Sequence, residues 1–348
     1  MEFDFESYKQ KIAPALMDLE VVRKDAKKSI VGFVAFLIPM LAIGYYGMSQ
    51  DIAKEQEIFY IAGVVITFGV AAYFAFRFSK LYRKLREEFK NLVVEKIVSS
   101  FNDSEQSLSF NWKSFIPRST FMASGLFPKF PDEYNGEDHI RGARNDVNFE
   151  FSEVDAVEVT EVRRWEEYEE DGETYTREVV EEERRTIFKG IFFKANFNKP
   201  IKGSTFVYPD VAEKLLGNFL GNLVQKYNFP QSGKLVKLEN VEFEKEFAVY
   251  GTDQIESRFV LTPLIMEKIL KLKSQLDTKM YLSFLDNNVY VAVDYRKSLF
   301  EPKLLGEIAS TEDIQVMHQC ISFFISIIDE LNLEERLWDK KSTIKETA

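Results

Sequence analysis

Two uncharged apolar runs near the start of the chain constrain its fold more than any other feature. Residues 30–48 read IVGFVAFLIPMLAIGYYGM and residues 58–76 read IFYIAGVVITFGVAAYFAF, and neither run holds a charged side chain. A helix of that length rises roughly 28 Å, close to the hydrocarbon thickness of a bilayer. Because an isolated pair of segments in lipid must satisfy its backbone hydrogen bonds internally, both runs are predicted to be membrane-spanning helices.

The charges that flank these runs predict their orientation. Four basic residues precede the first run and five follow the second, whereas the connection SQDIAKEQE has one Lys against three acidic residues. The basic residues are Arg23, Lys24, Lys27, Lys28, Arg77, Lys80, Arg83, Lys84 and Arg86. Because Lys and Arg stay on the cytoplasmic side, we expect a multi-pass membrane protein with both termini cytoplasmic. The lipid bilayer is then its first partner.

Two other interpretations fit the pattern less well. A core helix of a soluble protein usually carries some polar residues over such a length, and here two runs have matched basic flanks. A cleaved export signal needs a short basic leader, but five acidic residues lie before Asp25 and a second apolar run follows.

The rest of the chain is acidic. Residues 101–348 hold 31 Lys and Arg against 44 Asp and Glu, a net charge of −13. Because such a surface repels phosphate backbones, we expect no nucleic-acid partner. The single cysteine, Cys320, excludes an internal disulfide, so nothing in the chain indicates an oxidising compartment.

Periodicity predicts three regions. Residues 1–101 should form a transmembrane hairpin with cytoplasmic stalk helices, because residues 77–101 repeat apolar side chains at helical spacing. Residues 102–335 should form a cytoplasmic α+β domain with a mainly antiparallel sheet, because runs with strand periodicity are followed by helical patterns. The strand runs lie at residues 146–154, 155–165, 184–197 and 204–209, and the helical patterns at 210–227, 261–276 and 312–331. Residues 101–114 and 126–142 read as irregular segments, and residues 336–348 as a disordered tail. Residues 279–295 read as a hairpin that turns at Asp286, Asn287 and Asn288, and Pro263 is expected near the first turn of the helix at 261–276.

Groups suited to catalysis are scarce. The chain has two histidines and one cysteine, and it contains no P-loop, GxSxG, HExxH or CxxC motif. We therefore expect no cofactor and no catalytic residue, and an enzyme is the less favoured class. His318 and Cys320 are interpreted as structural. Glu137, Asp138 and His139 offer metal-ligand atoms, but consecutive residues rarely converge on one ion, and we expect no metal site there.

An acidic hairpin is predicted between the second and third strand runs. Residues 165–185 read WEEYEEDGETYTREVVEEERR, with a turn near Asp171 and Gly172, and Tyr168 should pair with Tyr175 across it. The tip carries Glu166, Glu167, Glu169, Glu170 and Asp171. One interpretation is a solvated arm whose like charges prevent edge aggregation. The other is a docking arm for a basic partner.

A second candidate site lies where a strand is followed by a short helix. In the stretch FAVYGTDQIESRFVLTP, residues 247–263, we single out four residues as ligand-binding candidates: Tyr250, Asp253, Glu256 and Arg258. A strand-to-helix transition often opens a pocket. Helix capping by Asp253 and a pairing of Glu256 with Arg258 explain the same residues without a ligand.

This stretch, with residues 140–159 and 187–209, carries a family resemblance. The chain resembles a bacterial family of two-span membrane proteins known as domain of unknown function 3137, over about residues 10–330. The matching residues are Gly142, Phe149, Phe151, Ser152, Glu153, Phe188, Gly190, Phe192, Phe193, Gly203, Thr205, Tyr250, Asp253 and Glu256. With the predicted orientation, the resemblance implies a multi-pass protein of the bacterial inner (cytoplasmic) membrane. It implies no activity, cofactor or catalytic residue. It implies a LemA-type membrane protein as a partner.

Three functions remain open from the sequence. The favoured one is a membrane-anchored cytoplasmic scaffold or binding module with a protein partner. The second is a small-ligand sensor or enzyme with a pocket near residues 250–258. The third is a subunit of a transport or envelope-maintenance assembly. Homo-oligomerisation is compatible with each.

Overall fold

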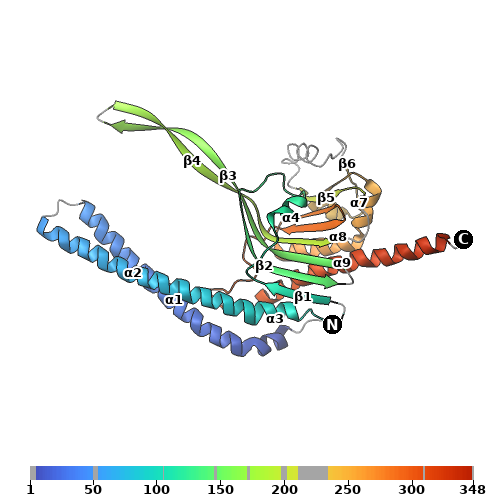
Figure 1. Ribbon diagram of the computed structural model, residues 1–348, viewed down its shortest axis with the longest axis horizontal. Coiled ribbons are helices and arrows are strands. Elements are labelled where there is room, and N and C mark those ends of the chain that lie inside the picture. Colours follow the sequence, from blue (N-terminus) through green and yellow to red (C-terminus); the bar gives the residue numbers. More distant parts are fainter. Residues whose placement is uncertain are drawn as a thin grey trace. The chain divides into compact units, whose positions relative to one another are not determined.

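The computed structural model describes residues 5–49, 54–104, 106–144, 147–170, 173–196, 202–210, 234–308 and 310–346 (Figure 1). The chain divides into two compact units. The helical unit comprises residues 1–97 and 300–315, and the sheet unit comprises residues 98–299 and 316–348.

Two long helices form most of the helical unit. Helix α1 spans Phe5–Ser49 and helix α2 spans Lys54–Phe89, after which a π-helical turn, η1 (Lys90–Val94), leads into α3 (Glu95–Ser99). The helices run antiparallel, since Phe36 stacks on Phe74 at 6.0 Å and Tyr46 on Tyr60 at 5.9 Å. The π-helical turn interrupts the single continuous helix that the apolar spacing of residues 77–101 predicts.

The apolar runs leave their side chains on the outside of the hairpin. Ile38 is 62% exposed and Ile66 is 66% exposed. The two helices are long and apolar enough to cross a membrane, and 0% and 6% of their most apolar windows are buried in the protein. A core helix of a soluble protein would bury this surface. The structure therefore confirms two apolar helices of the length that the two-span prediction requires.

Beyond the apolar runs, α1 and α2 pack along a buried seam. The Tyr8 hydroxyl donates to the Val93 carbonyl at 3.3 Å, and this hydrogen bond joins the beginning of α1 to η1. Burial raises the pKa of Tyr8. The seam is lined by fully buried apolar residues: Ile12, Leu19, Ala26, Leu85, Phe89, Val93 and Ile97.

A distant segment, residues 300–315, completes the helical unit. Lys90, in the π-helical turn, is fully buried, and its Nζ lies 2.7 Å from a carboxylate oxygen of Glu301. Arg86 pairs with the same carboxylate at 2.7 Å, and Arg23 donates to the Leu304 carbonyl at 2.9 Å. A buried lysine without a partner would strongly destabilise the fold, so the pairing of Lys90 with Glu301 attaches residues 300–315 to the helices. The predicted first region ends at residue 101, whereas the compact helical unit also includes residues 300–315.

A nine-stranded sheet organises the second unit (Figure 1). Its order is β1-β2-β3-β4-β9-β8-β5-β7-β6, and every pairing between described strands is antiparallel. The α+β prediction is confirmed. The strands are β1 (Gln106–Asn111), β2 (Glu133–Arg144), β3 (Val147–Glu170), β4 (Glu173–Asn196), β5 (Thr205–Pro209), β6 (Lys234–Leu235), β7 (Phe247–Gly251), β8 (Met280–Leu285) and β9 (Asn288–Val293).

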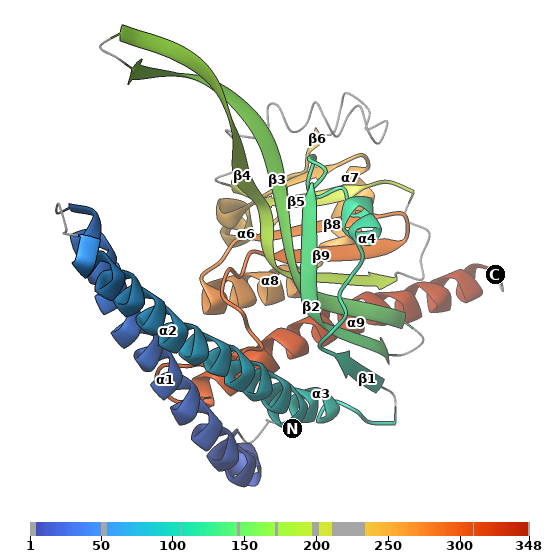
Figure 2. The same cartoon turned by 60° about the vertical axis from the view of Figure 1, so that its left-hand side comes forward.

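Helices cover both faces of the sheet (Figure 2). On one face, Phe324 of α9 (Thr311–Glu346) stacks on Phe193 at 4.6 Å and contacts Phe151 at 4.9 Å. On the other face, Phe121 of α4 (Arg118–Ala123) contacts Phe192 at 5.1 Å. Neighbouring side chains on a strand point to opposite faces, so Phe192 and Phe193 each reach a different core. The remaining helices are α6 (Val241–Glu246), α7 (Gln254–Val260) and α8 (Pro263–Leu276).

Several local predictions are confirmed. Asp286 and Asn287 have positive φ values of 49° and 59° and turn β8 into β9. Pro263 begins α8, as expected, and the structure adds Thr262 as its cap. The rings of Tyr168 and Tyr175 stack across the arm with centroids 5.8 Å apart.

Other local predictions differ from the structure. Residues 106–111 and 133–142, expected to be irregular, belong to strands β1 and β2 of the sheet. Helix α9 continues to Glu346, through most of the expected disordered tail, and no Gly or Pro follows residue 306 to end it. The helix predicted at 210–227 lies outside the described residues apart from Asp210.

Gly190 is predicted to be essential for the joint between β4 and β9. A Cβ at this position would lie 2.0 Å from the Val293 carbonyl oxygen and 2.5 Å from the Tyr295 nitrogen. The substitution Gly190→Ala should therefore lower the free energy of unfolding by about 1–3 kcal/mol, because backbone atoms must move apart. Thermal unfolding of the full chain in detergent measures the loss.

Lys189→Ala is the matched control for this substitution. Lys189 is exposed and pairs only at the surface with Asp155, so its removal should cost about 0–1 kcal/mol. Unfolding of Gly190→Ala at the same temperature as Lys189→Ala would contradict the assigned close approach.

Candidate functional site

A β-bulge in β2 determines the geometry of the most polar region of the sheet. Glu137 pairs with Glu153 and Ile140 with Phe151, so Asp138 and His139 together lie opposite Ser152. Asp138 adopts a left-handed conformation with φ of 59° and is completely buried. An extra residue shifts the alternation of side chains between the faces. The bulge therefore separates groups that are consecutive in the sequence.

On one side of the bulge lies a cluster of three carboxylates. Ligand oxygens of Glu137, Asp138 and Glu153 lie within 4.8 Å of one another. The Leu299 amide donates to Glu153 at 2.6 Å. Oxygen atoms in this arrangement are the ligands that Mg²⁺ and Ca²⁺ prefer, so these are described residues that could hold a cation. Glu153 comes from the neighbouring strand, and no spacing in the sequence connects it with residues 137 and 138.

A cleft of about 240 Å³ opens beside this cluster. Its walls combine acidic and basic groups, and Lys189 pairs with Asp155 at 2.6 Å within it. Pockets that hold drug-sized ligands usually measure about 300–1,000 Å³, so this cleft accommodates only a small polar molecule or an ion. It is lined by Asn135, Gly136, Glu137, Glu153, Val154, Asp155, Lys189, Gly190, Tyr295, Arg296, Lys297 and Ser298.

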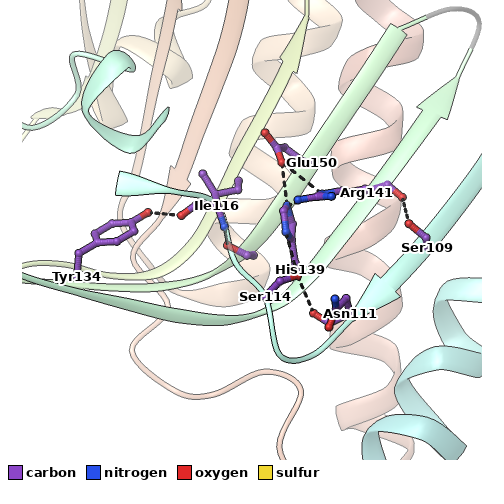
Figure 3. A network of polar contacts seen from close by, with 9 residues as sticks. Ser109, Asn111, Ser114, Ile116, Tyr134, His139, Arg141 and Glu150 are labelled. Carbon is purple, nitrogen blue, oxygen red and sulfur yellow. Dashed lines mark hydrogen bonds and ion pairs between the residues drawn. The ribbon is translucent and has the colours of Figure 1, made fainter. Parts of the chain in front are cut away.

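His139 lies in a network of polar contacts with other partners (Figure 3). Its Nε2 is 2.8 Å from a carboxylate oxygen of Glu150, and its Nδ1 is 3.3 Å from the Ser114 hydroxyl. Arg141 also approaches the Glu150 carboxylate, at 3.8 Å. The hydrogen bond from His139 holds the pKa of Glu150 below its ordinary value, against the opposing effect of burial.

The same network attaches the segment after β1 to the sheet. The Ile116 amide donates to the Ser152 hydroxyl at 3.0 Å, and the Tyr134 hydroxyl donates to the Ile116 carbonyl at 2.8 Å (Figure 3). Burial raises the pKa of Tyr134. Because His139 is engaged through both ring nitrogens, its hydrogen bonds stabilise the fold, and it does not join the carboxylate cluster.

The four residues predicted near the β7–α7 junction make contacts within the fold. Asp253 caps α7 by accepting from the amides of Ile255 and Glu256. The Glu256 carboxylate accepts from the Gly203 amide at 2.6 Å, and Arg258 donates to the Lys237 carbonyl at 3.1 Å. Glu256 therefore contacts the segment before β5, and the pairing with Arg258 is not observed among the described ion pairs.

Tyr250 completes this set. It lies in β7, is 8% exposed and belongs to the core beneath α4. None of the four residues lines the cleft beside the bulge, a cleft of about 210 Å³ near Arg141 or a cleft of about 470 Å³ near Lys273. The last of these borders Asp210, next to the undescribed residues 211–233.

His318 and Cys320 do not form an activated pair. Cys320 is fully buried, and burial raises the pKa of its thiol. Burial lowers the pKa of His318 to about 4, and its ring packs on Phe101 at 4.6 Å. A nucleophilic cysteine needs a lowered thiol pKa, so this site has the opposite of the required electrostatics.

The acidic hairpin is a long two-stranded arm. Residues 158–170 of β3 and 173–185 of β4 pair only with each other among the described strands, since β2 reaches only Val157 and β9 only Ile191. Figure 2 shows this arm extending from the sheet. Of its predicted docking residues, Glu166 pairs with Arg177 at 2.7 Å, Glu167 and Glu169 are exposed, and Asp171 lies outside the described residues.

These features define the class of the protein. It is an α+β protein with a nine-stranded antiparallel sheet, joined to two helices long and apolar enough to span a membrane. Residues 186–333 match the family described as "Protein of unknown function (DUF3137)", which confirms the family resemblance over this part of the chain. No curated protein and no solved structure matches the chain.

Glu150 is predicted to stabilise the sheet in a pH-dependent way. Glu150→Gln removes the charged acceptor of a buried histidine and should lower the free energy of unfolding by about 1–3 kcal/mol at neutral pH. The folded pKa of Glu150 is below the ordinary 4.5, so its contribution is present above pH 4.5 and is lost as the pH falls through the folded pKa. The difference from wild type should therefore shrink in acid.

Denaturant unfolding of the full chain in detergent, repeated across this pH range, measures the effect. Asp155→Asn is the control, since its carboxylate pairs with Lys189 at the surface and should contribute about 0–1 kcal/mol. A difference between Glu150→Gln and wild type that grows as the pH falls would contradict the assignment.

Proposed function

We propose that this protein is a membrane-anchored binding module whose β3–β4 arm docks a basic protein partner. The observation that carries the proposal is the arm itself. About thirteen residues of each strand extend beyond the sheet without a hydrophobic core beneath them. Isolated two-stranded ribbons are marginally stable in water, so a ribbon of this length adds little to the stability of the domain.

Charge indicates the kind of partner. Residues 161–185 contain eleven acidic and five basic side chains. Several of the bases are already paired within the ribbon, as in the contacts of Arg177 with Glu166 and Arg163 with Glu178. The remaining carboxylates give the arm a negative potential that attracts a basic surface and accelerates the encounter with it. A LemA-type membrane protein, the partner that the family resemblance implies, is the first protein to test.

The membrane anchor is the second part of the proposal. The positive-inside rule applied to the flanking basic residues supports an inner-membrane protein with both termini in the cytoplasm and a short external connection between α1 and α2. In this arrangement the sheet unit and its arm meet cytoplasmic partners. The anchor restricts the search for a partner to the membrane surface and its neighbourhood.

Removal of the arm should abolish partner binding and leave the fold intact. Residues 160–183 can be replaced by Asn-Gly, because Val159 and Arg184 are paired and suit a two-residue turn. In-cell crosslinking followed by mass spectrometry should recover a Lys- and Arg-rich partner region with the full chain and lose it with the shortened variant. Equal thermal unfolding of both proteins in detergent is the control. Identical crosslinked proteins from both would contradict the docking role.

Cysteine accessibility tests the proposed topology. In a Cys320→Ser background, Lys54→Cys should react with a membrane-impermeant maleimide in intact bacterial cells, because α2 begins at this residue, next to the external connection. Lys24→Cys, on the exposed surface of α1, should react only after the cells are permeabilised. Labelling of both positions in intact cells, or extraction of the protein by alkaline carbonate, would rule out the anchored arrangement.

A further inference from the structure

The two faces of the arm differ in how their aromatic and apolar side chains are covered. Paired residues of an antiparallel ribbon share a face, and the register places Tyr168, Tyr175, Glu166 and Arg177 on one of them. There the tyrosine rings stack, Arg177 binds Glu166 at 2.7 Å and its guanidinium lies 5.5 Å from the Tyr168 ring. On this face, the tyrosine face, the aromatic rings contact each other and Arg177.

The opposite face has an exposed apolar pair within a ring of carboxylates. Trp165 is 72% exposed and Val180 is 53% exposed, and the register makes them diagonal neighbours. Two bases serve this face: Arg163 lies 3.5 Å from Glu178, and Arg184, just beyond its inner end, lies 3.7 Å from Glu182. We call it the tryptophan face; it comprises Glu161, Arg163, Trp165, Glu167, Glu169, Thr174, Thr176, Glu178, Val180 and Glu182.

The tryptophan face is costly to maintain in the free protein. Glu161 and Glu182 lie directly opposite each other, a cross-strand pairing of like charges that is destabilising. An indole exposed to this extent also keeps a large apolar surface in water. Both costs are removed when cations and apolar side chains of a partner cover the face.

From this asymmetry we infer that the tryptophan face binds a Lys- and Arg-rich polypeptide segment that also carries apolar side chains. This inference rests on the proposed docking function of the arm. A cation within about 6 Å of the indole plane is attracted by the ring, and an arginine can also donate to the neighbouring Glu167 or Glu178 carboxylate. The apolar residues of the segment cover Trp165 and Val180. These two side chains then lie at the centre of the contact, and the charged pairs lie around them.

A defined peptide tests this assignment on the full chain in detergent. The probe is a fluorescent peptide of alternating Arg and Leu, and its binding is followed by anisotropy. Trp165→Ala should weaken binding about tenfold or more, as expected for a central aromatic anchor. The double substitution Glu167→Gln with Glu178→Gln should weaken it by a similar factor.

The matched control changes the same number of charges on the tyrosine face. Glu166→Gln with Glu181→Gln removes two carboxylates that pair with Arg177 and Arg164, and it should alter binding by less than about twofold. A peptide in which Glu replaces Arg should not bind. Circular dichroism of each variant checks that the ribbon is retained.

The possible results separate the two proposals. Weakening by the tryptophan-face variants alone supports the inference. Equal weakening by both double variants, with binding lost in the variant shortened at residues 160–183, overturns the tryptophan face as the site and retains the arm. Binding to the shortened variant that equals wild type overturns the docking function of the arm and, with it, the inference.

Discussion

The pairing of β3 with β4 is the interaction on which the rest of the sheet unit depends. It runs from Phe149 opposite Ala195 to Glu170 opposite Glu173, so one ladder serves two purposes. At its inner end it carries the aromatic side chains that hold α4 and α9 on opposite faces. At its outer end the same hydrogen bonds continue without any covering layer. The rigid inner sheet therefore provides the support from which an exposed ribbon can extend.

Polar residues in this protein stabilise the structure in two different ways. Inside the sheet unit, the network of His139, Glu150 and Ser114 joins a loop to the sheet, and inside the helical unit the buried Lys90 is paired with Glu301. These charges are satisfied and shielded, so their main effect is to select one arrangement of the chain. On the arm the charges are exposed and only partly paired, so their field reaches solvent and partners.

The sequence predicted much of the fold and less of the polar cluster. The hairpin turn at Asp286 and Asn287, Pro263 at the beginning of α8 and the apolar helices follow from local rules that neighbouring residues determine. The position of β2 in the sheet does not, because its bulge interrupts the alternation on which strand prediction relies. For the same reason Glu153, on the adjacent strand, joins Glu137 and Asp138 while the consecutive His139 turns away.

By itself the sequence determined the two apolar helices, the α+β class and the acidic hairpin with its stacked tyrosines, since periodicity and charge are local properties of the chain. Only the tertiary structure decided which groups meet across large separations. It brought residues 300–315 back to the first helices through Glu301, and it placed Trp165 and Val180 on the face opposite the tyrosines. Strand register and buried charge pairing produce these contacts, and both depend on residues far apart in the chain.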